Sequence, residues 1–130
     1  MTQTPALDQK TFGSYVEEAV ASLPKKFKKL LDNIAVIVED SPPPEVYRET
    51  GSPRRSLILG TYQGVPYQHR GPWYGNTPPD VIVIYRKPIE QICRTRAEIK
   101  QKVREVVIHE IGHYFGFSDA QMREIEETTR

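Results

Sequence analysis

Two histidines and a glutamate near the C-terminal end of the chain have the spacing of a hydrolytic metal site. His109, Glu110 and His113 follow the pattern H-E-x-x-H. Four residues make about one helical turn, so on a helix both imidazoles point to the same side, where neutral histidines can hold one zinc ion. Glu110 can then act as general base on a zinc-bound water. The motif therefore predicts a Zn²⁺ centre that supports hydrolysis.

The residues after the second histidine offer a third ligand. Gly116 can end the helix and reverse the chain, and Asp119 follows three residues later. An aspartate oxygen is an ordinary zinc ligand, so Asp119 can complete the site. Glu105 and Glu124 are alternative carboxylate ligands, the second only if the final helix folds back differently. The competing interpretation is an amphipathic helix whose histidines are satisfied in the core without a metal.

The composition is typical of one globular domain spanning residues 1–130. Hydrophobic residues make up 38% and charged residues 27% of the chain. The 18 basic and 17 acidic side chains leave a net charge of +1, which argues against nucleic acid or a membrane surface as partner. No apolar run approaches the ~20 residues of a membrane span.

The N-terminus lacks a signal-peptide pattern. The single Cys93, expected as a small buried hydrophobe, cannot form an internal disulfide. We therefore expect a cytoplasmic protein; its eleven prolines are also typical of heat-adapted proteins.

The motif lies on a predicted helix with a defined start. Thr95 can cap this helix, and Glu98 sits three residues later to complete a capping box. One apolar stripe contains Ile99, Val103, Val106 and Val107, and the opposite side of the second half contains Ile108, Ile111 and Phe115. The second half is therefore apolar almost all round, which predicts burial. A buried helix with two histidines and a glutamate must satisfy those groups through a metal or through hidden partners.

The other elements predict an α+β fold. Helical spacing indicates helices over residues 9–23, 25–32 and 120–130, the last with Ser118 as cap. Continuous β-favouring runs indicate strands over residues 34–38, 56–62 and 81–85. The first strand is expected to be covered on both faces, and Pro88 is expected to close the third.

A long segment between Gln63 and Asp80 is rich in glycine, proline and aromatic residues. Loops of this length are often functional, although the aromatics can also simply cover the core. If the loop folds over the cleft, the residues that could steady an oxyanion are Tyr67, His69 and Tyr74.

The sequence HEIGHYFGFSD over residues 109–119 resembles the signature H-E-x-x-H-x-x-G-x-x-H/D of the metzincin metallopeptidases. More closely, the chain resembles small bacterial proteins described as minimal matrix-metalloprotease-like zincins. That resemblance extends to LPKKFKKLLDNIAVIVED, LILGTYQGVP and PPDVIVIYRKPIE, and so covers most of the chain. It implies a zincin-like α+β fold: a small twisted mixed sheet of about three to four strands packed on an active-site helix, with N-terminal helices and a short C-terminal helix. It also implies that His109, His113 and Asp119 are the zinc ligands and that Glu110 is the base.

Two departures from the metzincin pattern matter. Asp119 stands where most metzincins have histidine, and its negative charge should make a zinc-bound water less acidic. Residues 120–130 are too few for the subdomain that carries a methionine turn beneath the metal. Met122 could supply that apolar floor, but plain core packing is the favoured expectation.

These features predict a zinc-dependent peptidase acting on peptides or unfolded protein segments. We expect the substrate to add as a strand along an exposed sheet edge, for which residues 81–85 are the candidate. The alternatives are a non-catalytic zinc-binding structural or interaction module, and a metal-free scaffold. The sequence carries no signal for an oligomeric state.

Overall fold

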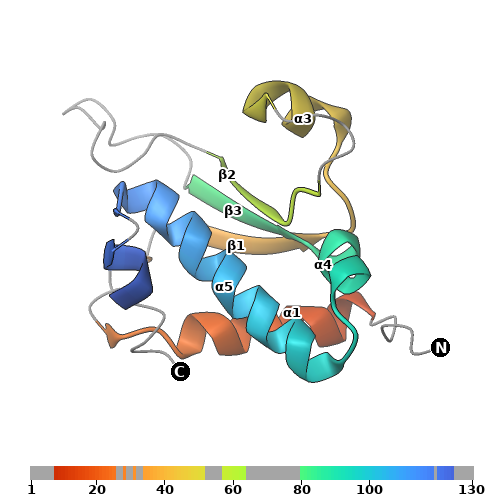
Figure 1. Cartoon of the computed structure of the whole chain (residues 1–130), viewed down its shortest axis with the longest axis horizontal. Coiled ribbons are helices and arrows are strands. Elements are labelled where there is room, and N and C mark those ends of the chain that lie inside the picture. The colour runs from red at the N-terminus through yellow and green to blue at the C-terminus, as the bar shows by residue number, and fades with distance from the viewer. Residues whose placement is uncertain are drawn as a thin grey trace.

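The computed structural model of the chain describes residues 8–25, 28, 31, 34–51, 57–63, 80–118 and 120–124. It is a mixed α+β fold in which helices lie on both faces of a small sheet (Figure 1). The helices are α1 (Gln9–Ala21), α3 (Pro44–Thr50), α4 (Arg86–Ile92) and α5 (Arg96–Phe115). The strands are β1 (Ile34–Glu39), β2 (Gly60–Gln63) and β3 (Asp80–Tyr85). The predicted α+β class is confirmed.

The sheet has the strand order β1-β3-β2 and is mixed. Strand β3 pairs in parallel with β1, from Ile34 opposite Asp80 to Glu39 opposite Tyr85. It pairs antiparallel with β2, with Gly60 opposite Ile84. Because β3 is hydrogen-bonded on both sides, the expectation that residues 81–85 form an exposed edge is wrong. The outer strands of the described sheet are β1 and β2.

Alternate residues of β3 enter two different hydrophobic clusters, because successive side chains of a strand point to opposite faces. Ile82 and Ile84 are fully buried in the main core, whereas Val83 and Tyr85 pack with Val46 of α3. Helix α3 lies on the face of the sheet opposite α1 and α5 (Figure 1). Burial on both faces explains the unbroken apolar run of this central strand.

Strand β1 was expected to be covered on both faces, and this is wrong. Its residues Ile34, Val36 and Val38 pack against the main core, but Ile37, which points the other way, is 40% exposed. The difference arises because β1 is an outer strand, and its second face receives little cover.

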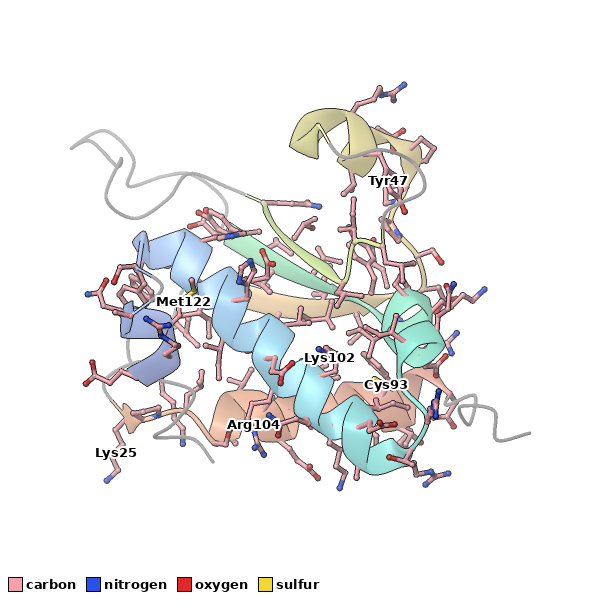
Figure 2. The ribbon with its side chains drawn as sticks, in the orientation of Figure 1. Lys25, Tyr47, Cys93, Lys102, Arg104 and Met122 are labelled. Atoms are coloured by element: carbon pink, nitrogen blue, oxygen red, sulfur yellow. The ribbon has the colours of Figure 1, made fainter. Side chains whose placement is uncertain are left out.

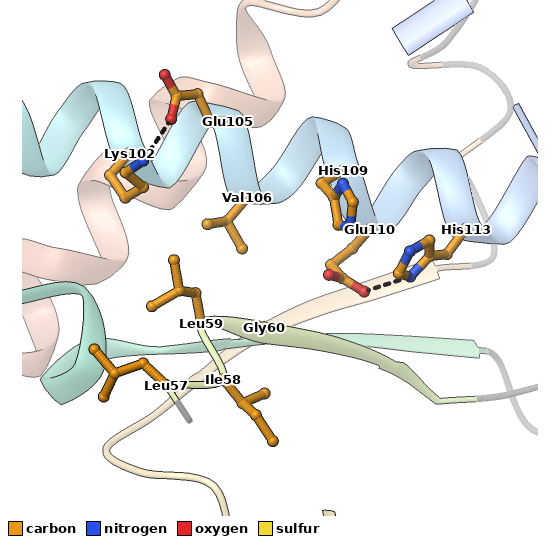
Figure 3. A pocket seen from close by; sticks show the side chains of 10 residues that line it. All are labelled: Leu57, Ile58, Leu59, Gly60, Lys102, Glu105, Val106, His109, Glu110 and His113. Atoms are coloured by element: carbon orange, nitrogen blue, oxygen red, sulfur yellow. Dashed lines mark hydrogen bonds and ion pairs between the residues drawn. The ribbon is translucent and has the colours of Figure 1, made fainter. Parts of the chain in front are cut away.

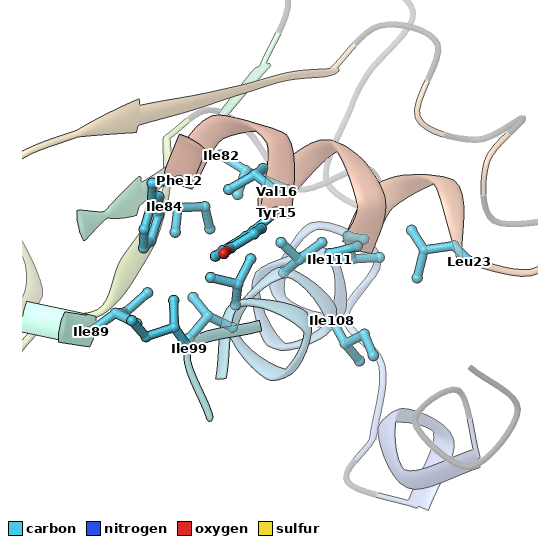
Figure 4. Packing of buried hydrophobic residues seen from close by; sticks show 14 of the residues in the cluster. Phe12, Tyr15, Val16, Leu23, Ile82, Ile84, Ile89, Ile99, Ile108 and Ile111 are labelled. Atoms are coloured by element: carbon cyan, nitrogen blue, oxygen red, sulfur yellow. The ribbon is translucent and has the colours of Figure 1, made fainter. Parts of the chain in front are cut away.

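The main core lies between α1, α5 and one face of the sheet (Figure 4). Helix α1 is capped by Asp8, whose carboxylate accepts a hydrogen bond from the Thr11 amide at 2.7 Å. It buries Phe12, Tyr15, Val16 and Ala19. Ile108 and Ile111 of α5 are buried in the same cluster, as the sequence predicted for that side of the helix. This packing fixes the helix that carries the motif.

Both ends of α5 follow the predicted signals. The Thr95 hydroxyl accepts a hydrogen bond from the Glu98 amide at 3.1 Å, and the Glu98 carboxylate accepts from the Thr95 amide at 3.0 Å. The C-cap is Gly116, in the left-handed conformation at φ 67°. A residue with a side chain is strained there, so this glycine defines where the helix stops.

Two short helices were not predicted. Pro88 was expected to close the third strand, which ends at Tyr85, and it lies in the first turn of α4. Pro44 lies in the first turn of α3. Proline fits there because the first amides of a helix have no intrahelical acceptor. Strand β2 also begins at Gly60 rather than at residue 56. The helix predicted over residues 25–32 falls mostly outside the described residues.

Cys93 follows α4 and is buried, which agrees with its expected role as a small hydrophobe (Figure 2). Burial raises the pKa of its thiol. None of the described helices is both long enough and apolar enough to cross a membrane.

Candidate metal centre

Helix α5 brings the three motif side chains together near its C-terminal end. One potential ligand atom from each of His109, Glu110 and His113 lies within 4.8 Å of the others. The two imidazole rings have centroids 4.5 Å apart and are both exposed (Figure 3). This is the convergence that the H-E-x-x-H spacing predicts. Two imidazoles beside a carboxylate are a donor set suited to zinc.

Glu110 differs from the two histidines because it is buried, with 4% of its surface exposed. One of its carboxylate oxygens lies 3.2 Å from Nδ1 of His113 (Figure 3). This hydrogen bond raises the pKa of His113, although desolvation of the imidazole acts in the opposite direction. A neutral imidazole that donates from Nδ1 to this carboxylate keeps Nε2 available for a metal ion, so the contact is compatible with metal binding at His113.

A groove of about 470 Å³ runs along α5 from these three residues. Its other wall is formed by Leu57, Ile58 and Leu59, the segment that leads into β2, and by Gly60 (Figure 3). Leu57 is 44% exposed, so apolar surface is available in the groove. The motif therefore lies at one end of a cleft large enough for side chains of an extended peptide.

Lys102 and Glu105 line the other end of this groove and form an ion pair of 2.8 Å. Glu105, one of the alternative carboxylate ligands, is therefore engaged with a lysine. Glu124, the other alternative, lies in a helical turn over 120–124 and is exposed. Within the described part of the chain, neither belongs to the group of potential ligands formed by the motif.

The chain turns sharply after α5, as expected for the third ligand. The amide of Phe117 donates to the carbonyl of Gly112 at 2.9 Å. The Ser118 hydroxyl accepts from the Gln121 amide at 3.2 Å, and the Gln121 side chain accepts from the Ser118 amide at 2.8 Å. The predicted cap at Ser118 is thus confirmed. Asp119 itself lies outside the described residues, so its role as a ligand stays a prediction.

Met122 packs against α5 directly at Gly112. A Cβ placed on Gly112 would lie 2.9 Å from Cγ of Met122 and closer still to its Sδ. The methionine is half-buried in this position. The contact agrees with the packing role favoured for Met122, and it links the turn after α5 back to the motif helix.

The three candidate oxyanion donors of the long loop, Tyr67, His69 and Tyr74, lie outside the described residues and remain predictions. The structure also adds groove residues that sequence reasoning missed, namely Leu57, Gly60 and Lys102. Gly60 carried a usable signal, because a glycine inside a strand pattern often marks a close approach of another element.

Comparison with known proteins gives matches to a protein family and to solved structures. A family model described as zincin-like metallopeptidase matches residues 31–129. A conserved hypothetical protein from Thermus thermophilus has a similar solved structure, with a TM-score of 0.55 and 22% sequence identity over 82% of this chain and 92% of that one. At this identity the structural match shows a shared fold. No curated protein matches the chain significantly.

Proposed function

The chain belongs to the zincin-like metallopeptidase family, and from this premise we propose that it is a zinc-dependent peptidase with Glu110 as general base. The observation that supports this most directly is the gathering of His109, Glu110 and His113 at the end of a groove. A metal-free scaffold would have no need for two exposed imidazoles beside a buried carboxylate.

His109 and His113 would hold the zinc ion, with Asp119 as the third ligand. Bound zinc would supply Lewis acidity, which polarises a carbonyl oxygen and lowers the pKa of a water toward about 7. The carboxylate of Asp119 would make that water less acidic than three histidines would. The turn that begins at Gly116 supports this ligand set, since it brings the chain back toward α5.

Glu110 would handle the proton of the reaction. As the water oxygen forms a bond to the peptide carbonyl carbon, the carboxylate takes the proton that the water releases. It then delivers this proton to the amide nitrogen as the carbon–nitrogen bond breaks. The carboxylate contacts His113 in this structure, so this role requires it to turn from the imidazole toward the water.

The substrate would be an extended peptide or an unfolded segment lying in the groove. Strand β2 takes the place that the sequence assigned to residues 81–85, because it is the outer strand beside α5 in the part of the sheet that the structure describes. The apolar wall from Leu57 to Leu59 offers contacts for substrate side chains. A folded protein cannot present its backbone in this way, which favours short peptides and unfolded chains.

The test is cleavage of a mixed peptide library by zinc-loaded protein, followed by mass spectrometry. The wild type should produce defined fragments and Glu110→Ala should not. Glu18→Ala, on the exposed side of α1, removes a carboxylate away from the groove and should cleave like wild type. Equal cleavage by wild type and Glu110→Ala would overturn the assignment of the base.

The same experiment separates the peptidase from the non-catalytic zinc module that the sequence also allowed. If neither wild type nor Glu110→Ala cleaves, while both bind zinc and melt at higher temperature with it, the metal is structural. The zinc identity of the metal, the cytoplasmic location and the lack of nucleic-acid or membrane partners remain predictions.

A further inference from the structure

Gly60 lies at a place where α5 packs tightly against the sheet. A Cβ on this glycine would lie 2.7 Å from Cγ1 of Val106, 3.0 Å from the carbonyl oxygen of Val83 and 3.5 Å from Cγ of Glu110. The first distance is shorter than real Cβ contacts allow. A side chain at position 60 would therefore force the Val106 side chain, α5 or the strand to shift.

The direction of this contact follows from the pairing of the strands. Gly60 is opposite Ile84, which faces the main core under α5. The next residue, Thr61, points to the other face, where its hydroxyl lies 3.3 Å from the Tyr85 hydroxyl. Position 60 is thus the residue of β2 that faces the helix at the level of Glu110.

The helix presents two residues to this glycine. Val106 and Glu110 are four residues apart, so they lie on one side of α5, and both are buried. The imidazoles of His109 and His113 are exposed instead. A Cβ at position 60 would clash with Val106 but would only touch Cγ of Glu110, at 3.5 Å. Gly60 therefore acts on Glu110 through the distance between α5 and the strand, which the contact with Val106 sets.

We propose that Gly60 is a positioning residue: its missing side chain sets the depth at which the Glu110 carboxylate is held beside His113. The functional meaning of this inference rests on the proposed role of Glu110 as base. The geometric part does not, because it concerns the position of Glu110 in the metal-free protein.

The experiment compares Gly60→Ala with Thr61→Ala. Both change one residue of β2, but Thr61→Ala alters the face away from α5. Long-range proton–nitrogen NMR spectra of the histidine side chains, recorded at a single pH on metal-free protein, report the contact between Glu110 and His113. We expect Gly60→Ala to shift the His113 Nδ1 signal and Thr61→Ala to leave it in place.

Removal of Cγ1 of Val106, the atom nearest to the new Cβ, should reverse the shift of the His113 signal. Val106→Ala takes away Cγ1, so Gly60→Ala combined with Val106→Ala should return the His113 signal toward that of Val106→Ala alone. This pair also keeps the test valid if Gly60→Ala by itself fails to fold. An unshifted His113 signal in Gly60→Ala, or the same shift in Thr61→Ala, would overturn the proposal.

Kinetics connect the geometry to the chemistry. For a working peptidase, Gly60→Ala should lower kcat about 10- to 100-fold, the cost of a displaced catalytic group, with KM nearly unchanged. Its zinc affinity should stay close to that of wild type. A shifted His113 signal without cleavage by any variant would refute the peptidase and keep the positioning role. Cleavage by wild type with kcat unchanged in Gly60→Ala would refute the positioning role and keep the peptidase.

Discussion

Replacement of Gly112 by alanine tests whether the Met122 side chain occupies the space over Gly112, next to His113 in the chain. In a helix interior, alanine is favoured over glycine by about 1 kcal/mol. Gly13 of α1 shows the undisturbed case, since a Cβ there would meet no atom within 4 Å. Gly13→Ala should therefore raise the free energy of unfolding by about 0.5–1 kcal/mol.

Gly112→Ala should behave differently, because its Cβ would enter the space of Met122. Overpacking of this kind costs about 1–3 kcal/mol, which cancels or exceeds the gain in helix propensity. We expect a net change between about zero and 2 kcal/mol of destabilisation. The change is near zero if the turn over 120–124 moves away from α5, because the protein then loses only the packing of one half-buried methionine.

Measurements in a Met122→Ala background separate the cost of overpacking from the gain in helix propensity. With the thioether removed, Gly112→Ala should stabilise the protein by about 1 kcal/mol, like Gly13→Ala. The double-mutant cycle should then give a coupling energy of at least about 1 kcal/mol between positions 112 and 122. The measurement is urea unfolding of the metal-free variants, with the slopes compared to confirm that two-state behaviour holds.

Stabilisation of the wild-type background by Gly112→Ala, as large as that by Gly13→Ala, would contradict the packing of Met122 against Gly112. That result would mean that Met122 does not occupy the space over Gly112, and that the turn after α5 is held by other contacts. If the contact is present, zinc affinity should also fall in Gly112→Ala. The reason is that Asp119, the predicted third ligand, lies between Gly116 and Met122 on the displaced segment.

Thr95→Ala should lower the free energy of unfolding by about 1 kcal/mol, because it removes the cap of α5, whereas Thr95→Ser should be nearly neutral; urea unfolding that shows no difference between the two would contradict this. Cys93 should react with iodoacetamide more slowly than a model thiol, with its rate rising only at higher pH, because burial raises its pKa and the thiolate is the nucleophile; mass spectrometry measures the rate, and a model-thiol rate would mean that Cys93 is accessible. Asp119→Ala should lose stoichiometric zinc in metal analysis of the purified protein, and retention would assign the third ligand elsewhere. Zinc at a hundred times its Kd should stabilise the wild type by about 2.7 kcal/mol, which a chelator should reverse in a thermal melt; identical melts would argue against a bound metal.

Local signals in the sequence determined the helix that carries the candidate site. The capping box of Thr95 and Glu98 acts over three residues, and the stop at Gly116 is a backbone property of one residue. The side-by-side placement of His109 and His113 follows from helical periodicity alone. Such features can be predicted because the interacting groups are close in the chain.

The edge of the sheet, the groove and the packing of the motif were decided by the tertiary structure. The apolar sequence of residues 81–85 does not distinguish a central strand from an outer one. Only the pairing of β3 with both β1 and β2 shows that these residues are central. The segment that begins at Leu57 forms a wall of the groove because β2 lies beside α5, which begins only at Arg96. Gly60 beneath Glu110 and Met122 against Gly112 depend on the same distant packing. Periodicity tells which residues of an element share a face, but which other element meets that face depends on how all of them share one core.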